Sequence, residues 1–253
     1  MKTHSIQASE NRGQFTKFIN SVVTMTVLAT SIFMTSCDNN EVTPSGNLPK
    51  PSTIAATPTP GGSAVSFTAA STFGTVRLDA AGVYWVEDFF QGTAGTGSNP
   101  HQPNNTYYYD FFSVDGGTAS NFALKFGGTA NGDITFGSGW TGRYTTTNFS
   151  SVTSSTATLA LAGTPATFGL NNVSVGTPTG WTVNATRPGW YNYDRVNHVV
   201  YPLADNGGSV TLVVTNGSVT YAVEIQDIYL GGIPNSNVPP TNYPYFKFRY
   251  KQI

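Results

Sequence analysis

The sequence predicts an all-β fold, an antiparallel sandwich-like domain built from hairpins and meanders. Apolar residues alternate with polar ones at a period of two in several short segments, as strands with one buried face require. Gly- and Pro-containing turns separate these segments at short intervals. Charged residues make up only 10% of the chain and aromatic residues 13%. No stretch shows sustained 3.6-residue periodicity, so a helical protein is not expected.

The alternation is clearest near the C-terminus. Apolar residues fall at even positions in 210–214 and at odd positions in 219–226. Between these segments, Asn216-Gly217 tolerates the positive φ angles of a tight turn, which predicts a hairpin. The apolar residues move to even positions at Ile228 and Leu230, which predicts a β-bulge near Gln226-Asp227.

The last strand is equally regular. Phe246, Phe248 and Tyr250 fall on one face, and basic residues fall between them. We expect this terminal strand to be paired into the sheet. The other expected strands are 64–67, 74–78, 83–89, 106–113, 122–126, 141–146, 156–161, 167–170 and 181–184. The segment 92–103 is the longest irregular stretch, and it contains His101.

The first residues predict a targeting segment. Lys2, Arg12 and Lys17 form a basic leader, followed by an apolar stretch over 18–34 that Thr and Ser dilute. Cys37, the one cysteine of the chain, comes directly after it. This is the pattern of a bacterial lipoprotein, so we expect residues 1–36 to be a signal peptide and Cys37 to be lipidated. A spanning helix needs about 20 apolar residues, so we expect membrane attachment by the lipid anchor alone.

Residues 37–62 are expected to form a tether. The segment is rich in Pro, Thr, Ser and Gly and cannot bury a core. The acidic cluster from Asp38 to Glu41 has two interpretations, an export signal to the outer face of the outer membrane or the start of a solvated linker. The folded domain is expected to span 63–253.

Charge and motifs exclude several functions. Removal of the leader leaves nine basic and twelve acidic residues, a net charge of about −3, so nothing favours nucleic-acid binding. Hydrolase, metalloprotease, phosphate-binding and dinucleotide-binding motifs are absent from the sequence. Glu87 and Asp88 are adjacent on an expected strand and point to opposite faces, so they cannot form a glycosidase pair. Acids further apart, such as Asp194 and Asp227, stay open, but we expect no enzyme.

The C-terminal run also resembles a known family. Its features are Trp190 to Tyr193, His198 to Pro202, the segment from Ile225 to Gly232, and a final Phe248-Arg249-Tyr250. In order and spacing these resemble the HmuY family of haem-binding lipoproteins of the Gram-negative outer membrane. A looser resemblance extends back to Tyr107. The resemblance to this family implies a HmuY-type β domain that captures haem, from solution or from haem-carrying proteins, and passes it to an outer-membrane haem receptor.

The haem hypothesis depends on axial ligands. Haem iron takes imidazole, thioether, thiolate or tyrosinate. All three methionines lie in the leader, so His198 and His101 are the candidate ligands, with no metal other than haem iron expected. Family members use a pair of histidines or methionines, and such a pair cannot be matched here residue by residue. The candidates for lining an apolar slot are Trp190, Tyr191, Tyr193 and Tyr201.

The alternative is a non-catalytic carbohydrate-binding or structural surface module on the same fold. Its exposed aromatic rings would stack on sugars, and Trp140, Trp181 and Trp190 are the candidates. Haem binding instead needs a histidine beside an apolar slot. In either case we expect a lipid-anchored outer-membrane protein, surface-exposed, with the periplasmic face as the alternative.

Overall fold

The computed structural model describes residues 57–92, 106–157 and 167–253, which belong to one compact unit. These residues are mostly strand, and the expected all-β, sandwich-like fold is confirmed. The strands are β1 Val65–Ser66, β2 Thr72–Leu78, β3 Tyr84–Gln91, β4 Tyr107–Asp110, β5 Asp115–Gly116, β6 Leu124–Gly127, β7 Asp133–Phe136, β8 Thr141–Thr145, β9 Gly169–Ser174, β10 Gly189–Asp194, β11 Val199–Pro202, β12 Thr211–Thr215, β13 Thr220–Asp227 and β14 Phe246–Gln252. The helical turns are η1 Thr129–Asn131, η2 Phe149–Ser151, α1 Ser154–Ala157, η3 Ala204–Asn206 and η4 Leu230–Gly232.

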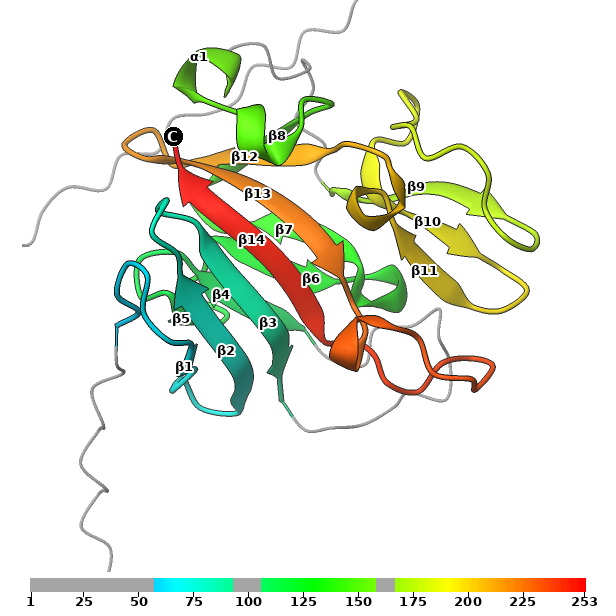
Figure 1. Cartoon of the computed structure of the whole chain (residues 1–253), viewed down its shortest axis with the longest axis horizontal. Helices are drawn as coiled ribbons and strands as arrows, with labels where there is room; N and C mark the ends of the chain where they lie inside the picture. The colour runs from blue at the N-terminus through cyan, green and yellow to red at the C-terminus, as the bar shows by residue number, and fades with distance from the viewer. Residues whose placement is uncertain (1–56, 93–105, 158–166) are drawn as a thin grey trace, which may run out of the picture. The chain divides into compact units, whose positions relative to one another are not determined.

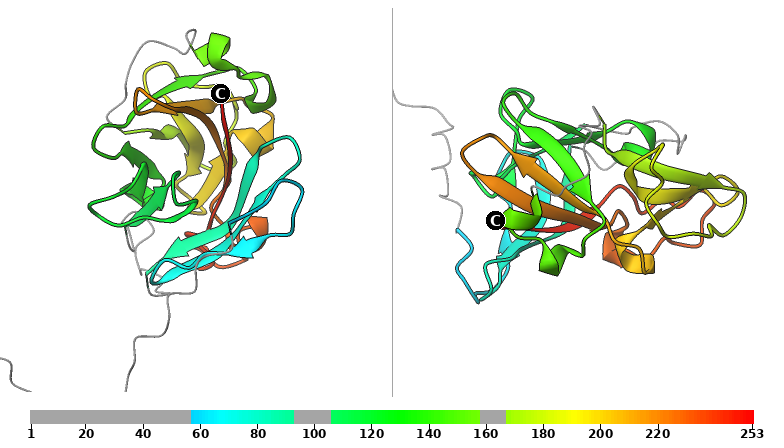
Figure 2. Two further views of the ribbon diagram at one scale, coloured as in Figure 1. Left: turned by 90° about the vertical axis from the view of Figure 1, so that its left-hand side faces the viewer. Right: turned by 90° about the horizontal axis from the view of Figure 1, so that it is seen from above.

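Three sheets make up the domain (Figure 1). A seven-stranded sheet has the order β1-β2-β3-β14-β13-β12-β8, so the C-terminal strand is central in it. A four-stranded sheet, β5-β4-β6-β7, lies behind it, as the turned views show (Figure 2). The third sheet, β11-β10-β9, lies beside these two and contains the candidate site.

Aromatic rings fill the space between the two larger sheets. Phe126 of β6 lies 4.2 Å from Phe246 of β14, measured between ring centroids, and Tyr109 of β4 lies 5.0 Å from Phe248. The hydroxyls of Tyr109 and Tyr250 are hydrogen-bonded at 3.0 Å across the same interface. The alternation at the C-terminus therefore selects the core face, because aromatic area buried between two sheets is a large source of hydrophobic stabilisation.

The C-terminal predictions are confirmed. β12 and β13 form the expected hairpin, with Gly217 at φ +88° in its turn. The pairing of β13 with β14 shifts register between Ile225 and Asp227, which is the predicted bulge. Phe246, Phe248 and Tyr250 are fully buried in the paired terminal strand.

Other element predictions need correction. Residues 181–184 form no strand, because the side chain of Asn171 satisfies backbone groups there: its Nδ2 donates to Thr182 O, and its Oδ1 accepts from Asn184 N. β4 ends at Asp110, whose carboxylate accepts from the backbone N–H groups of Phe112 and Ser113 and turns the chain. The expected strand 156–161 begins instead inside helix α1, and residues 158–161 lie outside the described residues. β9 pairs with β10 in parallel, an exception to the expected antiparallel order.

Candidate functional site

The β10–β11 hairpin holds His198, and Asp194 organises its turn. The Asp194 side chain is fully buried, and its Oδ1 accepts from Val196 N at 2.8 Å and from Gly176 N at 3.0 Å. Its Oδ2 accepts from Asn197 Nδ2 at 2.7 Å. Burial acts to raise the pKa of Asp194, but these hydrogen bonds outweigh it and hold the pKa below its ordinary value. The carboxylate therefore stays ionised and fixes the turn.

His198 ends this turn in the left-handed region, at φ +57°. The ring is half-buried, and its Nδ1 lies 3.0 Å from the hydroxyl of Tyr193. In the tautomer with the proton on Nδ1, the imidazole N–H donates to the tyrosine oxygen, and Nε2 is the atom that can coordinate a metal. A hydrogen bond at one ring nitrogen commonly orients a metal-binding histidine.

Burial sets the protonation of the tyrosine partner. It raises the pKa of Tyr193 to about 12, with smaller contributions from Tyr243 and Asp194. Tyr193 is therefore a neutral phenol at physiological pH. A neutral hydroxyl can hold the histidine ring but is not set up to serve as a tyrosinate ligand.

Exposed apolar side chains border the hairpin. Val196 in the turn is 52% exposed, and Val175, which precedes the Gly176 N–H bound by Asp194, is 84% exposed. The segment after β13 adds Leu230, Ile233 and Val238. These five are among the seven large apolar side chains that are exposed within the described ranges.

The predicted slot-lining residues have two different environments. Trp190, Tyr191 and Tyr193 are at most 3% exposed and belong to the core. The Trp190 indole N–H donates to Gly132 O at 2.7 Å, which ties β10 to the turn before β7. Tyr201 is half-buried and lies on the wall of a cavity with Asp227 and Tyr229. His101 and Cys37 lie outside the described residues.

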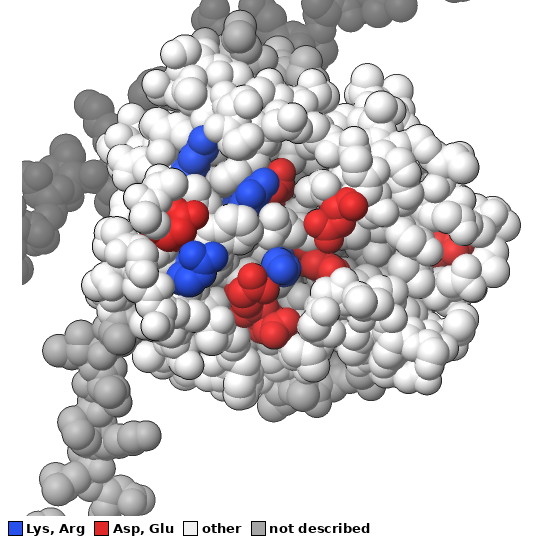
Figure 3. Space-filling model, viewed as in Figure 1, with Lys and Arg blue, Asp and Glu red and all other residues white. Residues whose placement is uncertain are grey.

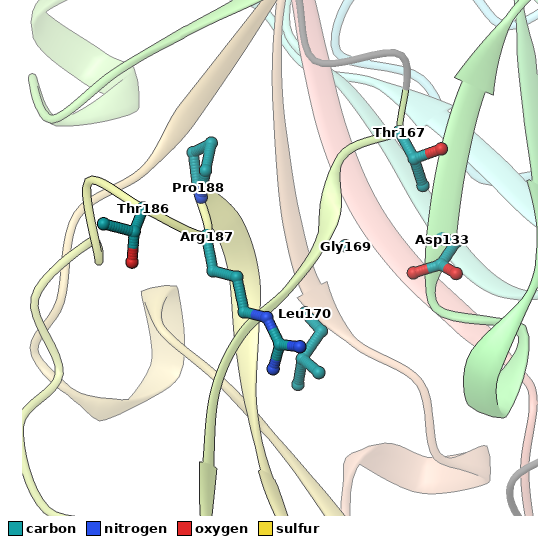
Figure 4. A pocket seen from close by; sticks show the side chains of 7 residues that line it. All are labelled: Asp133, Thr167, Gly169, Leu170, Thr186, Arg187 and Pro188. Carbon is teal, nitrogen blue, oxygen red and sulfur yellow. The ribbon is translucent and has the colours of Figure 1, made fainter.

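The cavities described for this domain do not include His198 in their walls. One of about 350 Å³ lies between Asp133 and Arg187, with Thr167, Thr186 and Leu170 around it (Figure 4). Another of about 370 Å³ lies beside Tyr84 and Lys251, and the third, of about 190 Å³, is the Tyr201 cavity.

The acidic candidates now have places in the fold. Glu87 pairs with Lys247 at 3.4 Å on the outer face of the large sheet. Both oxygens of the Asp194 carboxylate accept hydrogen bonds in and beside the β10–β11 turn. Asp205, which shares the Tyr201 cavity with Asp227, was not among the candidates predicted from the sequence. A lone aspartate in a polar loop gives no signal, because only the folded chain brings it to a strand more than twenty residues away.

Comparison with protein-family models, curated proteins and solved structures finds no match for this chain. Over residues 57–92, 106–157 and 167–253, no helix is long and apolar enough to cross a membrane. The same ranges hold no group of three or more His, Cys, Asp or Glu side chains arranged to bind a metal ion.

Proposed function

We propose that this chain is a lipid-anchored outer-membrane protein whose β domain binds haem through His198 and passes it to an outer-membrane receptor. The observation that carries the proposal is the hydrogen bond between His198 Nδ1 and the Tyr193 hydroxyl. In the tautomer with the proton on Nδ1, this hydrogen bond orients the imidazole, and Nε2 is the nitrogen that would coordinate the iron. Haem supplies the iron, and the protein supplies binding and orientation without catalysis.

The surroundings of His198 fit a flat apolar ligand. Val196 and Val175 present apolar surface at the turn, and burying such surface stabilises a complex by about 25 cal/mol per Å² before binding costs. Asp194 holds the turn without offering a charge to solvent, since its carboxylate is fully buried. His101 is proposed as a second axial ligand on the sequence alone.

The anchor rests on the sequence. A basic leader, a polar-diluted apolar stretch and Cys37 precede a Pro-rich tether. Lipid labelling in cells tests this part, with Cys37→Ser as the variant expected to lose the label. Unchanged labelling of Cys37→Ser would overturn the assignment of the anchor.

Absorbance titration with haemin tests the site. We expect a saturable one-to-one shift in the oxidised and reduced states, lost in His198→Ala and weakened in Tyr193→Phe. Tyr201→Phe is the matched control, because Tyr201 lies on a separate cavity wall. A shift that survives both His198→Ala and His101→Ala would refute histidine ligation, and no saturable shift would refute haem binding.

A second function, carbohydrate binding, is favoured by one observation. The rings of Trp181 and Tyr201 are both half-buried, with centroids 5.9 Å apart and planes inclined by 56°. Such a pair could contact a sugar ring. Binding of a neutral glycan that is lost in Trp181→Ala, with no haem shift, would favour this function.

A further inference from the structure

The outer face of the large sheet collects many of the domain's few charges (Figure 3). Lys247 pairs with Glu87 at 3.4 Å, and Arg249 Nε donates to Glu224 Oε2 at 2.6 Å. The Arg249 guanidinium also lies over the rings of Phe149 and Trp85. Two glutamates thus pair with Lys247 and Arg249, and the third cation of β14, Lys251, donates to Ser150 O at 3.1 Å.

Two aspartates beside them have no such partner. Asp227 ends β13 and is 4% exposed, and its Oδ1 accepts from Ile228 N at 2.6 Å and Tyr229 N at 3.1 Å. Within the described ranges its Oδ2 has no hydrogen bond, although Lys247 is its cross-strand neighbour. Asp205, in η3, is exposed and makes no side-chain hydrogen bond or ion pair with the residues that the structure describes.

Both carboxylates line the same cavity, which has a volume of about 190 Å³. The rest of its wall includes the polar Asn206 together with apolar or aromatic side chains such as Val199, Tyr201, Tyr229 and Pro234. The backbone N–H of Val200 donates to the Tyr229 hydroxyl at 2.7 Å, so this ring is fixed in place. Asp227 Oδ2 is therefore an acceptor on the cavity wall that no donor among the described residues uses, and a cationic group in the cavity would pair with it.

We propose that this cavity, named here the Asp205–Asp227 cavity, binds an alkylguanidinium or alkylammonium group. The cation would lie against Asp227 Oδ2 and Asp205, and its alkyl part against Val199 and Pro234. Tyr201 adds an aromatic ring of the kind that attracts cations. Calcium fits less well, because it needs six to eight oxygen ligands, whereas Val199, Val200, Pro202 and Pro234 line part of the cavity with apolar side chains.

The proposal does not depend on haem binding. His198 comes directly before β11, whose Val199 lines the cavity, but His198 is not part of the cavity wall. The cationic group could belong to a free small molecule or to an Arg or Lys side chain of a partner protein.

Isothermal titration of the full chain in neutral detergent at low salt tests the proposal, with n-butylguanidinium as the probe. We expect saturable millimolar binding and no binding of the neutral analogue n-butylurea. Asp227→Asn and Asp205→Asn should each weaken binding at least tenfold. Asn at 227 retains Oδ1 as the acceptor for the two backbone N–H groups, so the local fold is kept.

Asp79→Asn is the control, because it removes the same charge in the β2–β3 hairpin, which contributes nothing to the cavity. Equal binding of n-butylurea, or binding unchanged in both cavity variants, would overturn the proposal, as would no binding. A capped Gly-Arg-Gly peptide separates the sources. Tighter binding of the peptide than of n-butylguanidinium indicates a protein side chain, and the reverse indicates a small molecule.

Discussion

Replacing Asp194 by alanine should both destabilise the domain and loosen His198. The carboxylate accepts three hydrogen bonds, from Gly176, Val196 and Asn197, while fully buried. Hydrogen bonds to a charged group contribute about 1.5–3 kcal/mol each. Val196 and Asn197 are exposed, so their donors regain water, and we expect a net loss of about 2–4 kcal/mol rather than the full sum.

Urea unfolding at pH 7 measures this loss. With an m-value of about 2–3 kcal/mol per molar, the midpoint should fall by about 1 M. Asp194→Asn is the matched control, because its Oδ1 can still accept from Val196 and Gly176 while the contact to Asn197 is lost. We expect the asparagine variant to lose about 1 kcal/mol.

The pH dependence of the same variant has a defined sign. The folded-state pKa of Asp194 lies below its ordinary value of 3.8, so its stabilisation is present above that value and is lost as the pH falls through the lower folded pKa. The difference between the native protein and Asp194→Ala should therefore shrink toward pH 2–3. A loss below about 1 kcal/mol at pH 7, or haem binding unchanged in Asp194→Ala, would refute the assignment of Asp194 as the residue that holds His198.

Three further outcomes are expected. Tyr109→Phe or Tyr250→Phe alone leaves one buried hydroxyl without its partner and should lower the free energy of unfolding in urea by about 1–3 kcal/mol. The double variant should lose less than the sum of the two single losses, and additive losses would contradict this. Burial raises the folded-state pKa of Asp227, so ionisation destabilises the fold increasingly as the pH rises from the unfolded-state value of 3.8 to the higher folded-state pKa. Asp227→Asn should therefore stabilise the protein at pH 7, and this gain should vanish as the pH falls to about 3. A gain independent of pH would refute the reasoning. Phe248→Ala removes a ring that is fully buried between the two larger sheets and should lower the free energy of unfolding by about 3–5 kcal/mol, with a loss below 1 kcal/mol arguing against that packing.

The sequence was informative wherever one face of a strand is buried. Alternation predicted the β12–β13 hairpin, the bulge at Gln226-Asp227 and the pairing of the last strand, because a one-residue slip would expose the whole apolar set. It did not predict where side chains replace ladder hydrogen bonds. Asn171 and Asp110 end or prevent strands through their own side chains, and a residue list does not reveal which backbone groups they reach.

The candidate site was predictable only in part. Tyr193 and His198 could be named as candidates from the sequence, but the β10–β11 hairpin that joins them was not predicted. The strands are so fully covered that Trp190 and Tyr191 lie in the core, which alternation does not predict when both faces are buried. The link between Asp205 and Asp227 depends on η3 packing beside β13, a tertiary contact without a local signal.

Asp194 and Asp227 show how environment separates a structural carboxylate from a candidate binding group. Both side chains are at most 4% exposed, and in each case the loss of solvation on burial acts to raise the pKa. Asp194 accepts hydrogen bonds with both oxygens, and these bonds lower its pKa below the ordinary value despite burial. The ionised form of Asp194 therefore stabilises the turn. Asp227 accepts with Oδ1 alone, and burial prevails there. A cation that binds the folded domain at this carboxylate would stabilise it. Oδ1 of Asp227 holds the backbone after β13, whereas Oδ2, which has no hydrogen bond among the described residues, favours ligand binding.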